Sequence, residues 1–331
     1  MTRRRRISLL SAGVLLASGC FGEYAPGAVE TDVASGSTAS AASTTTDVTS
    51  TTGEVASSSS STGPAPVCEH LDILFLTDVS VSMAPFAQGI INVILALGTR
   101  VDETFGGVGS FNLAFAYNAP PNVNEQAVEV PPNGEGCTQL GALVRGVDDC
   151  VYDYDGRPYL TEGDDLGAGM TCLAGGLIAG QWSPLYETPQ TLDTIVAFLE
   201  GESTLSACNA GFHTPPNPLL IILIVDSEDE SQASVIQAVT AAVAARGTSL
   251  ESVGLFVIGA DASGCPDDQP NACNALPACR VQEFIQAGFT NVGLSDNVRR
   301  FNICRALEED AADVADDLLG QLSAVISGLC T

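Results

Sequence analysis

The chain has 331 residues, and its 12 basic residues, all of them arginine, are far outnumbered by 40 aspartate and glutamate residues. The formal net charge of −28 excludes a nucleic-acid-binding protein, because a phosphate backbone requires a basic face. It also disfavours docking on anionic lipid through charge. An apolar content of 45% is ample for a buried core, and the length allows one or two domains.

Residues 1–19 have the pattern of a secretory signal. A basic start at residues 3–6 is followed by an apolar run at 7–16 that is too short to span a bilayer, and then by small residues before Cys20. The segment resembles a bacterial lipoprotein signal, which implies that Cys20 is the first mature residue and carries the lipid. Phe21, rather than aspartate, follows the cysteine, as in outer-membrane lipoproteins. We therefore expect an exported protein that a lipid anchors to the cell envelope, on the outer membrane of a Gram-negative bacterium.

Residues 20–66 are dominated by serine, threonine, alanine and glycine. Such a composition cannot bury enough apolar surface to offset the loss of chain entropy on folding. We expect a disordered tether that holds a folded domain, residues 67–331, away from the membrane.

Eleven cysteines occur in the chain. Assigning Cys20 to lipid leaves ten, and an even number in an exported chain indicates up to five disulfides. A zinc cluster is disfavoured because no CxxC pair occurs and only two histidines are present. Cys68 lies just before the first predicted strand and Cys330 is the penultimate residue, so we expect these two to pair. Cys137 with Cys150 would close a local loop, and the remaining connectivity stays open.

Strand and helix patterns alternate along residues 67–331. Apolar runs predict strands at 71–76, 111–117, 219–225 and 252–258. Apolar positions at steps of three and four predict helices at 86–105, 192–199, 235–243 and 307–329. This alternation predicts an α/β fold with a doubly wound, mainly parallel sheet flanked by helices and stabilised by disulfides. Residues 118–215 are less regular, and we expect a long connection there with one or two helices.

Two acidic loops follow predicted strands. The first is Asp78-Val-Ser80-Val-Ser82, and the second begins at Asp226 within Asp-Ser-Glu-Asp-Glu-Ser. Ligands of doubly wound sheets bind beyond the carboxyl ends of the strands, where both loops would lie. Hard oxygen donors without sulfur or imidazole favour Mg²⁺, Ca²⁺ or Mn²⁺ over zinc. The sequence therefore predicts that these carboxylates and hydroxyls converge on a divalent cation, Mg²⁺ first among them.

Asp-x-Ser-x-Ser after a buried strand, with an acidic turn after a later one, resembles the metal-ion-dependent adhesion site (MIDAS) of von Willebrand factor type A (vWA) domains. LDILFLTDVSVSM, NAGFHTPPNPLLIILIVDSEDES and the tail from NICRALEED to Cys330 resemble the vWA lipoproteins abundant in myxobacteria and related bacteria. The resemblance covers most of residues 67–331 and is weak between 118 and 208.

The resemblance implies a division of roles among the site residues. Ser80 and Ser82 would bind the metal directly, while Asp78 and Asp226 would act mostly through water. A threonine from a middle loop would complete the set. Our choice for that residue is Thr171, and the alternatives are Thr138 and Ser183.

A cation held mainly by neutral hydroxyls keeps a positive charge and an open coordination position. It can then capture a carboxylate of a partner, so we expect a binding protein for a protein or matrix ligand rather than an enzyme. One alternative is an envelope scaffold whose metal site is vestigial. Another is a hydrolase, which would require a base beside a serine, whereas His70 and His213 are expected at the surface.

Overall fold

A computed structural model describes residues 68–98, 100, 108–118, 140–144, 146–147, 150–151, 157–178, 189–201, 205–212, 216–246, 249–261, 265, 273 and 275–330. The predicted signal at residues 1–19, the predicted lipidation site Cys20 and the predicted tether lie outside the described residues. The side chains of Cys137, Thr138, Cys150, Ser183 and His213 also lie outside them.

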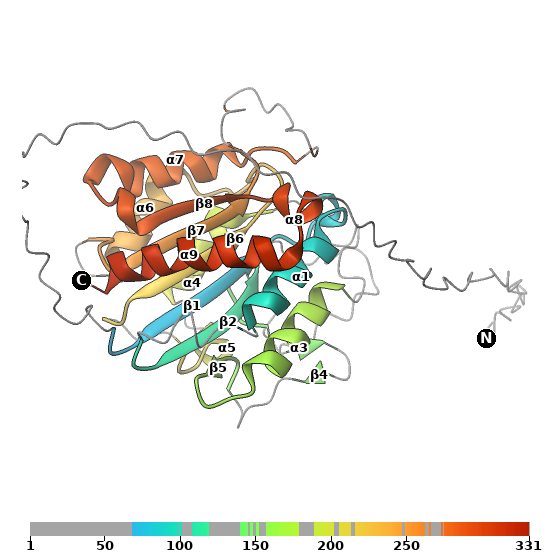
Figure 1. The fold of residues 1–331 in the computed structure, drawn as a ribbon. Coiled ribbons are helices and arrows are strands. Elements are labelled where there is room, and N and C mark those ends of the chain that lie inside the picture. Colours follow the sequence, from blue (N-terminus) through green and yellow to red (C-terminus); the bar gives the residue numbers. More distant parts are fainter. Residues whose placement is uncertain are drawn as a thin grey trace, which may run out of the picture. The chain divides into compact units, whose positions relative to one another are not determined.

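The central sheet has six strands in the order β5-β2-β1-β6-β7-β8 (Figure 1). Every neighbouring pair is parallel except β5 with β2, which is antiparallel and closes one edge. The strands are β1 (Leu71–Thr77), β2 (Phe111–Tyr117), β5 (Leu160–Thr161), β6 (Leu219–Ile224), β7 (Val253–Gly259) and β8 (Val298–Asn302), with β3 (Gly146–Val147) and β4 (Cys150–Val151) pairing separately. The prediction of a doubly wound, mainly parallel α/β sheet is confirmed.

Helices cover both faces of this sheet. The helices α1 (Ala87–Gly98), α3 (Leu166–Ile178) and α9 (Ala311–Leu329) pack on one face, and Figure 1 shows α1 and α9 lying across it. The helices α4 (Thr191–Glu200), α6 (Val235–Ala245) and α7 (Cys279–Gly288) pack on the other. Shorter elements are η1 (Val81–Met83), α5 (Leu205–Cys208), η3 (Thr290–Val292), η4 (Ser295–Asn297) and α8 (Arg305–Glu308).

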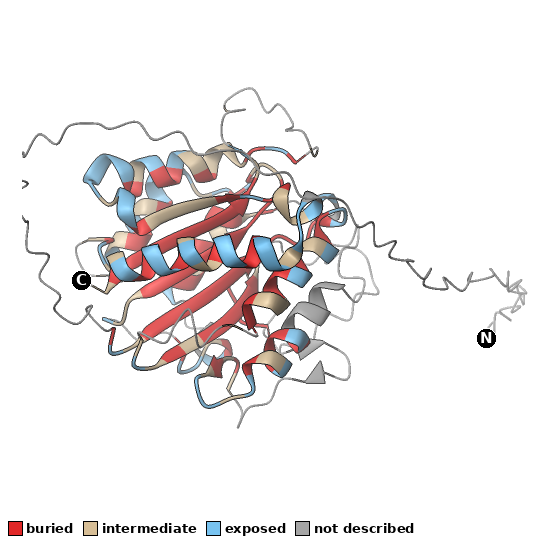
Figure 2. Ribbon diagram, in the orientation of Figure 1, coloured by how far each residue is buried: buried red, intermediate tan, exposed pale blue. Residues whose placement is uncertain are grey.

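The apolar runs that predicted the strands are explained by this double cover. Alternate residues of β1 enter the two cores, with Ile73 and Phe75 on the α1 side and Leu74 and Leu76 on the α4 side. All seven residues of the strand are buried, which is the pattern of a strand covered on both faces. Figure 2 shows buried strands inside helices whose outer surfaces are exposed.

The predicted C-terminal helix is in fact two helices. The apolar stripe from Leu307 predicts one continuous helix, but α8 ends at Glu308 and α9 begins at Ala311. The side chain of Asp310 accepts a hydrogen bond from the backbone of Ala312 at 2.9 Å, so this aspartate caps a new helix. Leu307 consequently lies outside the buried stripe, and 43% of it is exposed.

The elements not predicted from the sequence include the strand β8 and the helix α7. The strand β8 carries Arg299 and Arg300, which interrupt the apolar alternation, and it lies at an edge of the sheet where charge is tolerated. The helix α7 lies in a cysteine-containing region for which no helix was predicted. In addition, α1 ends at Gly98, whereas residues 101–105 of the predicted helix lie outside the described part.

Three disulfides are described. Cys68 pairs with Cys330, with Cα atoms 4.9 Å apart, so the expected bridge between the two ends of the domain is present. Cys265–Cys279 and Cys273–Cys304 tie the region before α7 to that helix and to the start of α8. Cys172 and Cys208 also form disulfides. Among the described helices, none is both long enough and apolar enough to cross a membrane.

The terminal disulfide should contribute more stability than the local one. Cys68 and Cys330 are 262 residues apart and Cys265 and Cys279 only 14. Loop-closure entropy then favours the terminal bridge by about 2.6 kcal/mol. We expect Cys68→Ala with Cys330→Ala to lower the free energy of unfolding more than Cys265→Ala with Cys279→Ala does, as measured by denaturant unfolding without reductant. Equal losses would contradict the entropic explanation.

Candidate metal site

The two acidic loops meet where the winding of the sheet reverses. β1 and β6 are adjacent and parallel, yet the chain leaves β1 toward α1 on one face and β6 toward α6 on the other. The loops after these strands therefore diverge and leave a crevice at the carboxyl edge, which is the position where doubly wound sheets bind ligands. The backbone N–H of Asp78 donates to Ile224 O at 2.9 Å, so the first loop starts in register with β6.

Side-chain oxygens from both loops form one hydrogen-bonded cluster. Ser80 Oγ lies 2.8 Å from Ser82 Oγ, and Ser82 Oγ donates to Asp226 Oδ1 at 2.9 Å. Asp78 Oδ1 accepts from the backbone N–H of Ser80 at 2.8 Å, and its Oδ2 accepts from Ser227 Oγ at 3.2 Å. The four residues expected to converge do converge, although the two loops are almost 150 residues apart in sequence.

The cluster is closed on the protein side and open on one side to solvent. Asp78 is fully buried, Ser80 and Asp226 are buried, and Ser82 is exposed. Leu276 N donates to Asp226 O at 2.7 Å, which fixes the backbone of the second loop. A ligand could therefore reach the cluster from the side of Ser82.

Burial perturbs both carboxyl groups. Desolvation raises the pKa of Asp78. Desolvation, followed by the charge of Asp78, raises the pKa of Asp226 to about 7. Two carboxylates brought together away from water repel each other, and each ionised form is disfavoured by the loss of solvent. Hydrogen bonds from serine hydroxyls offset only part of this cost.

The donor set fits a hard divalent cation. Desolvation is the largest influence on the pKa of Asp78 and of Asp226, and no ion pair among the described residues joins an arginine or histidine to either carboxylate. The cluster offers two carboxylates and two hydroxyls, the oxygen donors that Mg²⁺, Ca²⁺ and Mn²⁺ prefer. No group of three or more histidine, cysteine, aspartate or glutamate side chains suited to a metal occurs among the described residues. Any cation would thus depend on the serines.

Two buried oxygens beside the cluster were not anticipated from the sequence. Asn118, the first residue after β2, donates its backbone N–H to Thr77 O at 3.1 Å, and its Nδ2 donates to Thr191 Oγ1 at 2.9 Å. Its Oδ1 has no hydrogen-bond partner among the described atoms, and the same holds for Thr77 Oγ1. This edge of the sheet therefore has unused hydrogen-bonding capacity. The sequence could not show that Asn118 lies beside Thr77, because that proximity depends on the pairing of β1 with β2.

No hydrogen bond among the described residues joins the predicted middle-loop ligand to this cluster. Thr171 is exposed on α3, and its hydroxyl donates to Gly167 O within the same helix at 2.7 Å. The alternatives Thr138 and Ser183 lie outside the described residues. The identity of this ligand therefore stays a prediction.

The rest of the second acidic loop organises the surrounding helices. Glu228 accepts from the backbone N–H groups of Cys279 and Arg280 at 2.5 and 2.9 Å, at the start of α7. Asp229, three residues after Asp226, accepts from Leu192 N at 3.3 Å at the start of α4. Burial raises the pKa of Asp229, and its Oδ2 lies 3.3 Å from the guanidinium of Arg280. Carboxylates at helix starts are favourable because they meet unpaired N–H groups.

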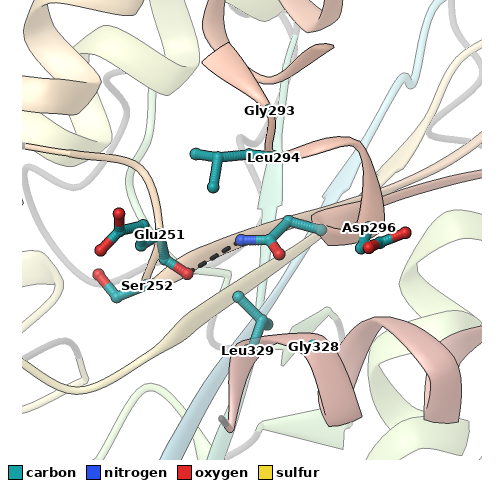
Figure 3. Close-up of a pocket in the computed structure, with 8 residues that line it drawn as sticks. Glu251, Ser252, Gly293, Leu294, Asp296, Gly328 and Leu329 are labelled. Atoms are coloured by element: carbon teal, nitrogen blue, oxygen red, sulfur yellow. Dashed lines mark hydrogen bonds between the residues drawn. The ribbon is translucent and has the colours of Figure 1, made fainter.

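A hollow of about 560 Å³ lies near the amino-terminal ends of β7 and β8, whereas the acidic loops follow the carboxyl ends of their strands (Figure 3). It is bounded by the residues before β7, by the η3–η4 segment and by the end of α9. Asn297 Nδ2 donates to Glu251 O at 2.9 Å across one side of it. None of the predicted metal ligands lines this hollow.

No protein-family model and no curated protein matches the chain. Among solved structures, the chain is similar to proximal thread matrix protein 1 from the mussel byssus with a zinc-occupied MIDAS motif (13% identity, TM-score 0.38, 77% of this chain and 48% of that one). It is also similar to the human COPII-coat protein Sec24c (13%, 0.41, 78% and 32%) and to the pilus adhesin SpaC from Lactobacillus rhamnosus GG (12%, 0.34, 78% and 30%). The chain spans about half of the mussel protein and about a third of the others. Because these TM-scores are below 0.5, the fold assignment depends on the strand order given above.

The raised pKa of Asp226 predicts the direction in which the stability of the metal-free protein changes with pH. The folded state holds this proton up to about pH 7, whereas an unfolded aspartate releases it near pH 4, so stability falls as pH rises between these values. In EDTA, we expect the Tm to be at least about 2 °C lower at pH 8 than at pH 5 from this group. Asp226→Asn should reduce the difference. An identical pH dependence in the variant would contradict this assignment.

Proposed function

We propose that the domain binds a partner through a divalent cation held between the two acidic loops. The observation that carries the proposal is the contact of Ser82 Oγ with both Ser80 Oγ, at 2.8 Å, and Asp226 Oδ1, at 2.9 Å. These oxygens belong to loops after different strands, and they meet at the edge where such sheets bind ligands. The resemblance of Asp-x-Ser-x-Ser to the MIDAS of vWA domains points to the same residues.

In this proposal Ser80 and Ser82 bind the cation directly, and Asp78 and Asp226 hold it mostly through water. Thr171 is the proposed middle-loop ligand. Neutral hydroxyls leave most of the positive charge on the ion, and the exposed side of Ser82 leaves a coordination position open. A carboxylate of a protein or matrix partner is the ligand chemistry that completes such a site.

Recognition rather than bond cleavage suits this edge of the sheet. No described histidine hydrogen-bonds to Ser80 or Ser82, and the one carboxylate that accepts from Ser82, Asp226, is assigned to the cation in this proposal, so neither hydroxyl keeps a free base once the cation binds. The proton of Ser82 is instead directed toward Asp226 Oδ1, and that of Ser80 toward Ser82 Oγ. A nucleophile without an adjacent base would be weak at neutral pH.

We further propose that the protein is an exported lipoprotein of the vWA type found in myxobacteria and related bacteria. The signal-like residues 1–19, Cys20 and the tether-like composition support this location. The disulfides support an oxidising compartment outside the cytoplasm. The lipid would be the only contact with the outer membrane.

Cation binding tests the proposal directly. We expect calorimetric titration to detect Mg²⁺, Ca²⁺ or Mn²⁺ binding to the wild-type protein. Asp78→Ala with Ser80→Ala should weaken it by at least about 10-fold, because ligands and their supports are both removed. Asp313→Ala with Ser323→Ala, which removes the same groups from the exposed face of α9, is the matched control and should leave binding unchanged.

Crystals soaked in Mn²⁺ provide a second readout, in which anomalous density is expected between Ser80, Ser82 and Asp226. If neither method detects a cation, or if the site variant and the wild type give the same isotherm, the binding proposal fails. An envelope scaffold with a vestigial metal site would then account for the convergence of the two loops without any ligand.

A further inference from the structure

A second polar cluster lies at the opposite, amino-terminal edge of the sheet. Asp72, at the second position of β1, is fully buried. Its Oδ1 lies 3.0 Å from His70 Nε2 and accepts from Asn112 Nδ2 at 2.9 Å. The other ring nitrogen, His70 Nδ1, lies 2.7 Å from Ser110 Oγ. A serine, a histidine and an aspartate are thus joined in series.

The distances favour one arrangement of protons in this series, because Ser110 Oγ lies 2.7 Å from His70 Nδ1 and 3.1 Å from its other acceptor, Glu69 O. Ionised Asp72 can only accept, so the 3.0 Å contact requires a proton on His70 Nε2. Asn112 Nδ2 lies 2.9 Å from Asp72 Oδ1, 3.0 Å from Phe212 O and 3.1 Å from His70 Nε2, and its two hydrogens are directed to the two nearer oxygens. In the arrangement with its proton on Nε2, His70 presents an unprotonated Nδ1 to the hydroxyl of Ser110. This is the state in which an imidazole can act as a base.

Accessibility also suits a reactive serine. Ser110 is partly exposed, and 25% of the His70 side chain is exposed, whereas Asp72 is completely shielded. Hydrolytic triads combine these features: an accessible serine, a histidine between, and a buried aspartate that fixes the tautomer. The two ring nitrogens have exchanged their usual partners, but either nitrogen can accept a proton.

We propose that Ser110, His70 and Asp72 form a nucleophilic site that accepts acyl groups from esters. Ser110 Oγ attacks the ester carbonyl carbon while its proton passes to His70 Nδ1. The tetrahedral adduct collapses with cleavage of the bond to the alcohol oxygen, which leaves with that proton. Water then attacks the acyl-serine by the same route, releasing a carboxylic acid and restoring Ser110. Asp72 is a positioning residue, because it acts through His70.

The surroundings of Ser110 restrict the substrate. The neighbouring backbone N–H of Gly109 donates to Cys68 O at 2.7 Å, and that of Phe111 donates to Glu162 Oε2 at 3.2 Å. Neither is available to stabilise an oxyanion, and each such donor contributes about 10²- to 10³-fold in rate. Esters with a good leaving group and a small acyl chain are therefore the substrate class. The site lies at the other end of β1 from the cation cluster and does not depend on it.

The test uses the full mature chain with p-nitrophenyl acetate. We expect release of nitrophenol and an acetyl group on the peptide that contains Ser110, located by mass spectrometry. Ser110→Ala should abolish the adduct and lower the release rate at least about 10-fold. Ser249→Ala, a serine outside the cluster, should change neither.

His70→Gln and Asp72→Asn separate reactivity from structure. Glutamine can still hydrogen-bond to Ser110 but cannot take its proton, so acylation should fall at least about 10-fold while the Tm of the protein changes little. Asp72→Asn should slow acylation through the wrong histidine tautomer. The proposal is overturned if the wild type carries no adduct at Ser110, or if the His70→Gln protein is acylated as fast as the wild type.

Discussion

The parallel pairing of β1 with a neighbour on each side determines which side chains can meet. Pairing with β6 places Thr77 opposite Ile224, so that the loops after the two strands begin side by side and Asp78 comes near Asp226. Pairing with β2 places Asp72 opposite Asn112, which brings His70 beside Ser110 at the other end of the same strand. The strand β1 is buried on both faces, so a shift of its register would expose apolar residues and is strongly disfavoured. The register of β1 therefore determines the geometry of both the cluster at Asp78 and the cluster at Asp72.

The two clusters differ in how their buried carboxylates are compensated. Asp72 receives hydrogen bonds from His70 and Asn112, and Arg246 interacts with it electrostatically. Asp78 and Asp226 receive hydrogen bonds from serine hydroxyls and the backbone, and the charge of one raises the pKa of the other. Burial of like charges is costly unless a cation joins them. The protein supplies the compensation at the amino edge and leaves it incomplete at the carboxyl edge, which is the physical reason for assigning a cation to the latter.

The sequence predicts those features that depend on neighbours in the chain. The apolar run of β6 and the spacing of Asp78, Ser80 and Ser82 identify a buried strand and an oxygen-rich loop without any knowledge of the fold. The pairing of His70 with Ser110 depends on residues 40 positions apart and on strand register, so no local pattern reveals it. The division between α8 and α9 depends on Asp310 capping a helix, a choice that a continuous apolar stripe conceals. The identity of the middle-loop ligand is the one part of the site that neither the sequence pattern nor the described contacts determine.

The second acidic loop is held too firmly to be a passive connection. The guanidinium of Arg280 donates to Ser231 O at 2.6 Å, to Asp229 O at 3.1 Å and to Ala233 O, while the backbone N–H of Arg280 donates to Glu228. One side chain thus fixes the backbone over several residues after Asp226, and the disulfide between Cys265 and Cys279 anchors the adjoining segment to α7. A loop that is ordered before binding loses little entropy when a ligand arrives. If a cation binds between the acidic loops, its affinity should therefore depend on residues such as Arg280 that never contact it.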